Sequence, residues 1–228
     1  MPELPGDPPI PLVLRRSARA RRFSLRVSRL DGRVTLTLPA RAAEAEAMAF
    51  ARSQADWLRR ALADQPAARP VAAGDWLPVE GQPRRLMPAP GRSVRLEADT
   101  LWLPGDPAQT GRRAAAFLRT LARDRLALAC DRHATRLGRR PTALVLRDTR
   151  SRWGSCTAGG RLMFNWRLAM APPAVLDYVA AHEVAHLAQM NHSPAFWAVV
   201  ETLLPDHGAA RRWLRAEGAA LHAWRFGD

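Results

Sequence analysis

Two histidines and a glutamate in the segment His182-Glu183-x-x-His186 have the types and the spacing of a catalytic metal site. On a helix, residues four apart lie one turn above each other on the same face, so both imidazoles can reach one metal ion. Glu183 sits beside the first histidine and can face the same point. In this arrangement two histidines bind Zn2+ and the glutamate acts as general base on a zinc-activated water. The segment therefore predicts a zinc site with Glu183 as its catalytic residue.

A third imidazole, His192, follows six residues after His186, just beyond Asn191, where the helix is expected to end. Asn tolerates the left-handed conformation of a helix C-terminus, so the chain can turn back there and bring His192 toward the pair. Three protein ligands and an open fourth position are typical of a catalytic zinc. His207 and His222 are alternative third ligands, and His192 is favoured because its connection is short. The competing interpretation, histidines that only pack or face solvent, is disfavoured because burying them unpaired is costly.

The elements around this site are expected to be helices and two strands in the C-terminal half of the chain. Apolar periodicity and Pro, Gly and Ser signals place them. The helices span 108–137, 172–191, a segment that starts at 194 and is broken by Pro205-Asp206, and about 207–222, and the strands 142–147 and 161–167. His133, near the end of the first of these helices, is interpreted as a surface or dipole-facing residue rather than a ligand.

The N-terminal part alternates short apolar strands with turn residues. We expect a β-hairpin over 12–38 with its turn at 30–33, and one helix over 41–63. Short strands within 66–110 are expected to join the hairpin in one small, mostly antiparallel sheet. Near Gly105 the sequence pattern changes from short strands and turns to a long helix. Residues 1–104 are thus predicted to be a β-rich subdomain with one helix, and 105–228 a second domain, in an α+β fold.

Composition narrows the setting. The chain has 228 residues, 47% of them hydrophobic, and no apolar run of 18 residues, so no membrane segment is expected. The N-terminus lacks the pattern of a signal peptide. Cys130 and Cys156 are far apart and are interpreted as free thiols. These features favour a cytoplasmic protein.

The net charge of +14 comes from 35 basic residues, all of them Arg, against 21 acids. The excess lies before residue 141, and eight Arg fall between 15 and 33. Such an excess favours an anionic partner such as nucleic acid. The alternative is a solvated face of a small sheet.

Several segments together resemble a known family. They are 151–156 (Ser-Arg-Trp-Gly-Ser-Cys), 164–168 (Phe-Asn-Trp-Arg-Leu), 177–186 with the histidine pair, and 191–197 with His192. This pattern is similar to the YgjP-like metallopeptidases, relatives of the SprT-like and WLM-type zinc proteases. The resemblance is dense from 142 to 214 and looser toward the N-terminus. It implies a zincin-like (gluzincin) core with His182, His186 and His192 as ligands and Glu183 as acid/base. This core would follow the small antiparallel β subdomain that the strand pattern predicts.

The resulting hypothesis is a zinc metalloendopeptidase of the HExxH...H type that acts on a protein or peptide. Strand 161–167 is expected to pair with the substrate. Arg152 and Tyr178 are candidates for stabilising the oxyanion, with structural roles as the alternative. Two other functions stay open: a nucleic-acid-associated protein, including a protease acting on DNA-bound proteins, and a non-catalytic zinc-stabilised domain. The oligomeric state is not indicated.

Overall fold

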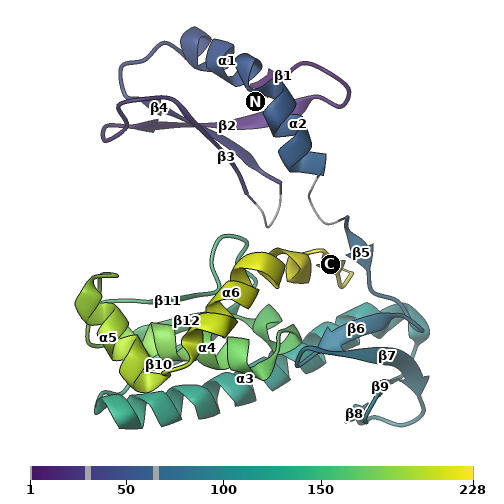
Figure 1. Ribbon diagram of the computed structural model, residues 1–228. Helices are drawn as coiled ribbons and strands as arrows, with labels where there is room; N and C mark the ends of the chain where they lie inside the picture. Colours follow the sequence, from purple (N-terminus) through teal and green to yellow (C-terminus); the bar gives the residue numbers. More distant parts are fainter. Residues whose placement is uncertain (1, 29–31, 64–66, 228) are drawn as a thin grey trace. The chain divides into compact units, whose positions relative to one another are not determined.

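The computed structural model describes residues 2–28, 32–63 and 67–227 and has a mixed α+β fold (Figure 1). The chain divides into two compact units, Met1–Ala67 and Ala68–Asp228. The division lies earlier than the expected boundary at 104/105. Residues 68–104 belong with the second unit because the apolar side chains of their strands, Leu77 and Leu101 among them, share its hydrophobic core.

The first unit is a four-stranded sheet with two helices packed on one face. Its elements are β1 (Glu3–Leu4), β2 (Ile10–Ser17), β3 (Ser24–Val27), β4 (Val34–Pro39), α1 (Glu44–Ser53) and α2 (Ala55–Ala63). The strands lie in the order β1-β2-β4-β3. Leu12 and Leu36 of the sheet share one hydrophobic core with Leu58 of α2, and all three are fully buried. Alternation along the strands leaves the opposite face uncovered by these helices.

Two expectations for this unit are corrected. The hairpin is formed by β3 and β4 alone, because β2 pairs in parallel with β4 rather than with β3; residues 30 and 31 of its expected turn lie outside the described residues. The single helix predicted over 41–63 is two helices. The first helix, α1, ends at its C-cap residue Gln54, which has φ −105° and ψ 12°. The N–H of Gln54 donates to the Ala51 carbonyl, three residues earlier.

The second unit begins with a sheet of its own. Its strands are β6 (Trp76–Val79), β7 (Gln82–Ala89), β8 (Arg95–Leu96) and β9 (Thr100–Pro104), in the order β6-β7-β9-β8. These strands do not join the N-terminal hairpin, which corrects the single sheet expected from the sequence. A further short strand, β5 (Arg69–Pro70), pairs in parallel with β13 (Trp224–Arg225) near the C-terminus.

Helices and a three-stranded sheet make up the rest of this unit. The helices are α3 (Thr110–Leu137), α4 (Pro173–Ala185), α5 (Pro194–Leu203) and α6 (His207–Glu217), with 3-10 turns η1 (Pro107–Gln109), η2 (Trp166–Met170) and η3 (Gly218–His222). The long helix predicted over 108–137 is confirmed as α3, and Gly138 ends it in the left-handed conformation with φ 68°. None of the described helices is long and apolar enough to cross a membrane.

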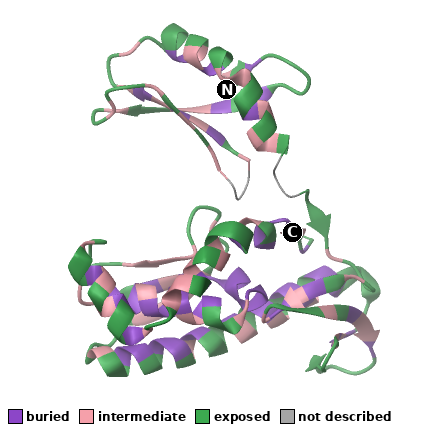
Figure 2. Ribbon diagram, in the orientation of Figure 1, coloured by how far each residue is buried: buried purple, intermediate pink, exposed green. Residues whose placement is uncertain are grey.

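The three-stranded sheet has the order β10-β12-β11. Its strands are β10 (Ala143–Arg147), β11 (Gly154–Cys156) and β12 (Arg161–Asn165). The segment 151–156, to which the sequence analysis assigned no strand, thus contains the edge strand. Strand β12, expected to pair with the substrate, is already paired on both sides. Helix α4 contacts both α3 and β11. Figure 2 shows buried residues throughout α4 and along α3, so α4 is a central, rigid support for its histidines.

Candidate metal centre

A helix end followed by a sharp reversal brings the histidines together. Helix α4 ends at Ala185, six residues before the expected end at Asn191, and His186 occupies its C-cap. Ser193 then caps α5, its hydroxyl accepting a hydrogen bond from the Phe196 N–H at 3.4 Å. The few residues between the two helices leave His192 next to the α4 pair.

The three side chains converge on one point. One ring nitrogen from each of His182, His186 and His192 lies within 4.8 Å of the other two. The ring centroids are 5.1, 5.0 and 4.9 Å apart. The alternatives lie elsewhere: His207 stacks on Tyr178 with centroids 5.8 Å apart, and His222 packs on Trp153 at 4.8 Å. Neither belongs to the cluster.

The chemistry of this cluster fits a metal ion. His186 donates from Nδ1 to the Gln189 carbonyl at 2.9 Å, which leaves its Nε2 lone pair free to coordinate. The Nε2 atoms of His182 and His192 lie 3.0 Å apart, a distance that needs a shared proton or cation. Burial, with the nearby charges of His186 and His192, lowers the pKa of His182 to about 3, so its imidazole is neutral, as a ligand must be.

An aromatic ring packs against the histidine cluster. Phe196 contacts all three imidazoles, with centroid distances of 4.9, 4.5 and 4.8 Å. It is fully buried, and because it lies in the first turn of α5, the same turn that reverses the chain also supplies the platform. From the sequence it could be assigned only as an inward-facing apolar residue.

Glu183 lies beside the cluster in a restricted position. It is 5% exposed, and its Oε2 has no hydrogen-bond partner among the described residues. Burial raises the pKa of Glu183 to about 8, against the opposing effect of the positive charge of Arg152. A Cβ on Gly154 would lie only 2.6 Å from its Cγ and Oε1, so the carboxylate packs directly on the backbone of β11. The sequence analysis missed this role of Gly154; a glycine within a strand is the signal that could have indicated a close approach.

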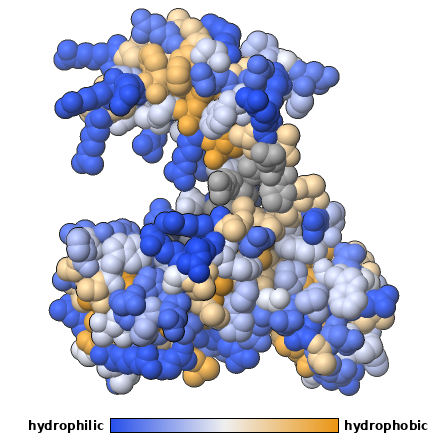
Figure 3. All heavy atoms as spheres, viewed as in Figure 1, coloured by the Kyte–Doolittle hydropathy of each residue, from blue (hydrophilic) through white to orange (hydrophobic). Residues whose placement is uncertain are grey.

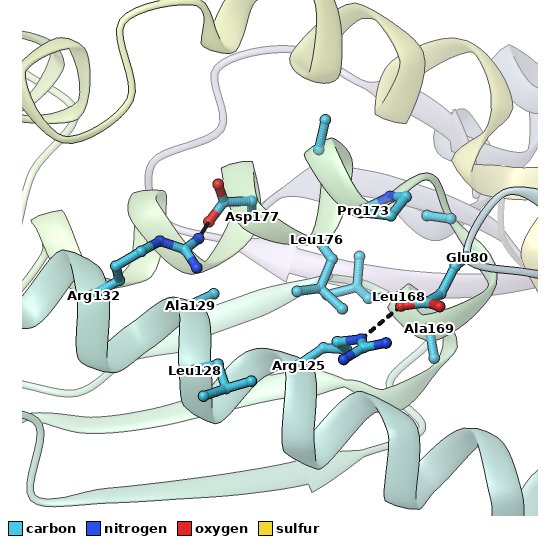
Figure 4. Close-up of a pocket in the computed structure, with 12 residues that line it drawn as sticks. Glu80, Arg125, Leu128, Ala129, Arg132, Leu168, Ala169, Pro173, Leu176 and Asp177 are labelled. Atoms are coloured by element: carbon cyan, nitrogen blue, oxygen red, sulfur yellow. Dashed lines mark hydrogen bonds and ion pairs between the residues drawn. The ribbon is translucent and has the colours of Figure 1, made fainter.

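Polar anchors hold the opposite side of α4. Asp177 accepts a hydrogen bond from Arg132 at 2.7 Å (Figure 4). It accepts another from the Nε2 of His133, also at 2.7 Å. His133 is 1% exposed, which corrects its assignment to the surface. Burial opposes ionisation of Asp177, but its bonds to His133 and Arg132 outweigh this and lower its pKa. A second ion pair, Arg125 with Glu80 at 2.6 Å, lines the same cavity of about 350 Å³. No residue of the histidine cluster lines this cavity. The bonds of Asp177 position α4, and neither ion pair takes part in the site.

A buried arginine fixes the loop that precedes β11. Arg167, 6% exposed, donates to Asp148 at 2.8 and 3.1 Å and to the carbonyls of Leu221 and Trp224 at 3.0 Å each. Asn165 donates to the Thr149 carbonyl at 2.7 Å. These bonds connect η2, the C-terminal segment and the loop that carries Arg152 and Trp153.

A family model matches most of the chain. Residues 21–217 match the family model described as YgjP-like, metallopeptidase domain. The search of curated proteins finds no match. Among solved structures, the chain is similar to the metallopeptidase zymogen abylysin of Pyrococcus abyssi, with 21% sequence identity and a TM-score of 0.36. That similarity covers 41% of this chain and 92% of that one.

Proposed function

Since the chain belongs to the YgjP-like metallopeptidase family, we propose that it is a zinc-dependent endopeptidase with Glu183 as its catalytic base. His182, His186 and His192 would hold the metal. The observation that carries this proposal is the convergence of three imidazole nitrogens beside one buried carboxylate. Three histidines leave a coordination position for water or substrate, as in catalytic zinc sites.

In the proposed reaction, Glu183 transfers a proton. When bound, zinc supplies Lewis acidity, which acidifies water and polarises the scissile carbonyl. Glu183 takes the proton of the attacking water and returns it to the leaving amine. Its Oε2 is buried and has no hydrogen-bond partner among the described residues, so no protein hydrogen bond of Oε2 has to break for this transfer. The closeness of Oε1 to Gly154 limits where the carboxylate can go. Arg152, whose positive charge acts on Glu183, stays a candidate for stabilising the oxyanion.

The free edge of β11 offers a place for the substrate backbone. Trp153 and Thr157 direct their backbone groups to β12, so by alternation Gly154 and Cys156 direct theirs to the open edge. An extended peptide can add there as a further strand. Because Gly154 contacts Glu183, a peptide paired at Gly154 would run past the general base.

The variant Glu183→Gln tests this function. It keeps the size and the metal ligands but cannot accept the proton, so we expect cleavage of an unstructured protein to be abolished while bound zinc, measured by elemental analysis, is unchanged. If the variant cleaves like the wild type, the assignment of the base is wrong. A non-catalytic zinc-stabilised domain predicts instead that neither protein shows metal-dependent cleavage.

A second candidate function is binding to nucleic acid through the first unit. Arg15 and Arg26 are exposed on the sheet face that α1 and α2 leave uncovered, where Arg15 lies opposite Thr37 and Arg26 opposite Thr35 on the intervening strand β4. Figure 3 shows hydrophilic side chains projecting from this unit. Guanidinium groups on such a face suit phosphate contacts without base recognition.

Salt dependence of duplex DNA binding tests this second function. The double variant Arg15→Gln/Arg26→Gln should lower the slope of log K against log salt by up to about 2, one for each lost phosphate contact. The matched control, Arg52→Gln/Arg60→Gln, removes the same charge from the exposed surfaces of α1 and α2 and should change the slope less. Absence of binding by the wild type at low salt would exclude this function.

A further inference from the structure

A cavity opens directly beside the proposed base and one proposed ligand. It has a volume of about 220 Å³, and Glu183 and His182 form one side of it. The remaining lining residues are apolar or aromatic, with Gly154 of the edge strand among them: Trp153, Gly154, Tyr178, Val179 and Leu214. A substrate paired along β11 would therefore have this cavity next to the bond it presents to Glu183.

The walls are held in place before any substrate binds. Trp153 packs on His222, and its ring lies so close to Gly218 that a Cβ there would be 3.2 Å from Cζ2. Tyr178 is 6% exposed and stacks on His207 with an angle of 10° between the rings. Burying an apolar group in such a pocket contributes favourable binding free energy, and no free energy is spent on ordering the walls.

The chemistry of the lining selects against charged side chains. Apart from Glu183 and His182, no lining residue can ionise near neutral pH. An acidic side chain would lose its hydration and face the Glu183 carboxylate, and a basic one would pair with the group that the reaction needs. A large apolar side chain has neither cost.

The volume of the cavity determines which substrate side chains fit into it. An apolar cavity of about 150 Å³ is known to accept benzene, so this one has room for a branched aliphatic or an aromatic side chain. Alanine would leave most of it unfilled. We propose that this cavity is the main specificity pocket and selects substrates with a large apolar side chain, such as Leu or Phe, beside the scissile bond. The inference rests on the proposed peptidase function.

Cleavage-site profiling of a proteome-derived peptide library by the zinc-loaded protein tests the inference. We expect Leu and Phe to be enriched at one of the two positions that flank the cut. Matched peptides that differ only at that position should then show kcat/KM at least about tenfold higher for Leu or Phe than for Ala or Asp. Cleavage without an apolar preference at either position would overturn the pocket assignment while leaving the proposed function intact. Absence of zinc-dependent cleavage would overturn both.

Variants of Leu214 test whether this cavity is the cause of the preference. Leu214→Ala enlarges the cavity and should raise the ratio of kcat/KM for Phe over Leu, and Leu214→Arg should shift preference toward Asp or Glu. The matched control is Leu128→Arg, the same change at a residue 60% exposed that lines the cavity on the other side of α4. It should leave the profile unchanged. If Leu214→Ala and a folded Leu214→Arg both keep the wild-type profile, another surface selects the substrate.

Discussion

Replacing Gly154 by alanine is expected to lower kcat/KM by about a hundredfold while zinc stays bound. The new Cβ would lie 2.6 Å from Cγ and Oε1 of Glu183 and 2.8 Å from Cδ, whereas ordinary contacts begin at 3.4 Å. The carboxylate must therefore move by about 0.8 Å, and misplacement of a catalytic group by about 1 Å can cost about a hundredfold in rate. Glu183 is 5% exposed, so it has little free space in which to relax.

The assay is hydrolysis of a single peptide identified as a substrate of the wild type, with zinc content and unfolding by urea measured on the same samples. Overpacking of this kind also destabilises by about 1–3 kcal/mol, so activity is compared well below the unfolding transition. Gly159→Ala is the matched control, because a Cβ there has only Thr157 Oγ1 within 4 Å, at 3.9 Å. It should retain activity. A Gly154→Ala protein with wild-type kcat/KM would refute the reasoning that the position of the Glu183 carboxylate limits the reaction.

Two further predictions concern stability. Asp148→Ala should lower the free energy of unfolding by about 2–3 kcal/mol, because it leaves the buried Arg167 without its carboxylate partner. The loss is smaller than for a fully buried partner because Asp148 is partly exposed. Urea unfolding measures this, and no change would mean that the carbonyls of Leu221 and Trp224 are enough to stabilise the Arg167 side chain. His222→Phe should flatten the dependence of stability on pH between about 6.5 and 4. Burial, with the charge of Arg167, lowers the pKa of His222 from 6.5 to about 4, so the unfolded chain binds this proton first and stability falls as pH falls through that window. The difference between wild type and variant should reach up to about 3 kcal/mol at pH 4, and parallel pH profiles would contradict it.

The local part of the site could be predicted from the sequence because it depends on short-range geometry. Two histidines four residues apart share a helix face wherever the helix forms, and a short connection keeps His192 near them. The helix end at 137 and the helix start at 194 are likewise marked by local signals, Gly138 and Ser193, and the structure confirms both positions. The α+β class and the family are confirmed as well.

The features that the sequence did not indicate depend on contacts between distant segments. Parallel pairing of β2 with β4 has no local turn to mark it. The edge strand β11 is three residues long and begins with Gly154, which has low strand propensity, so it resembles a loop. His133 is buried because Asp177, 44 residues later, accepts its hydrogen bond. The boundary after Ala67 follows from which core the strands of 68–104 join, and periodicity alone does not contain that information.

Metal stoichiometry tests the three-histidine centre most directly. We expect about one zinc per chain in the wild type, by elemental analysis after removal of loosely bound metal. His192→Ala should lose most of this zinc, because only two of the three proposed ligands remain, and it should keep the fold. His207→Ala, which changes the one histidine stacked on Tyr178, should keep it. A His192→Ala protein that binds zinc as tightly as the wild type, or a His207→Ala protein that loses it, would contradict the assignment of His182, His186 and His192 as the ligands.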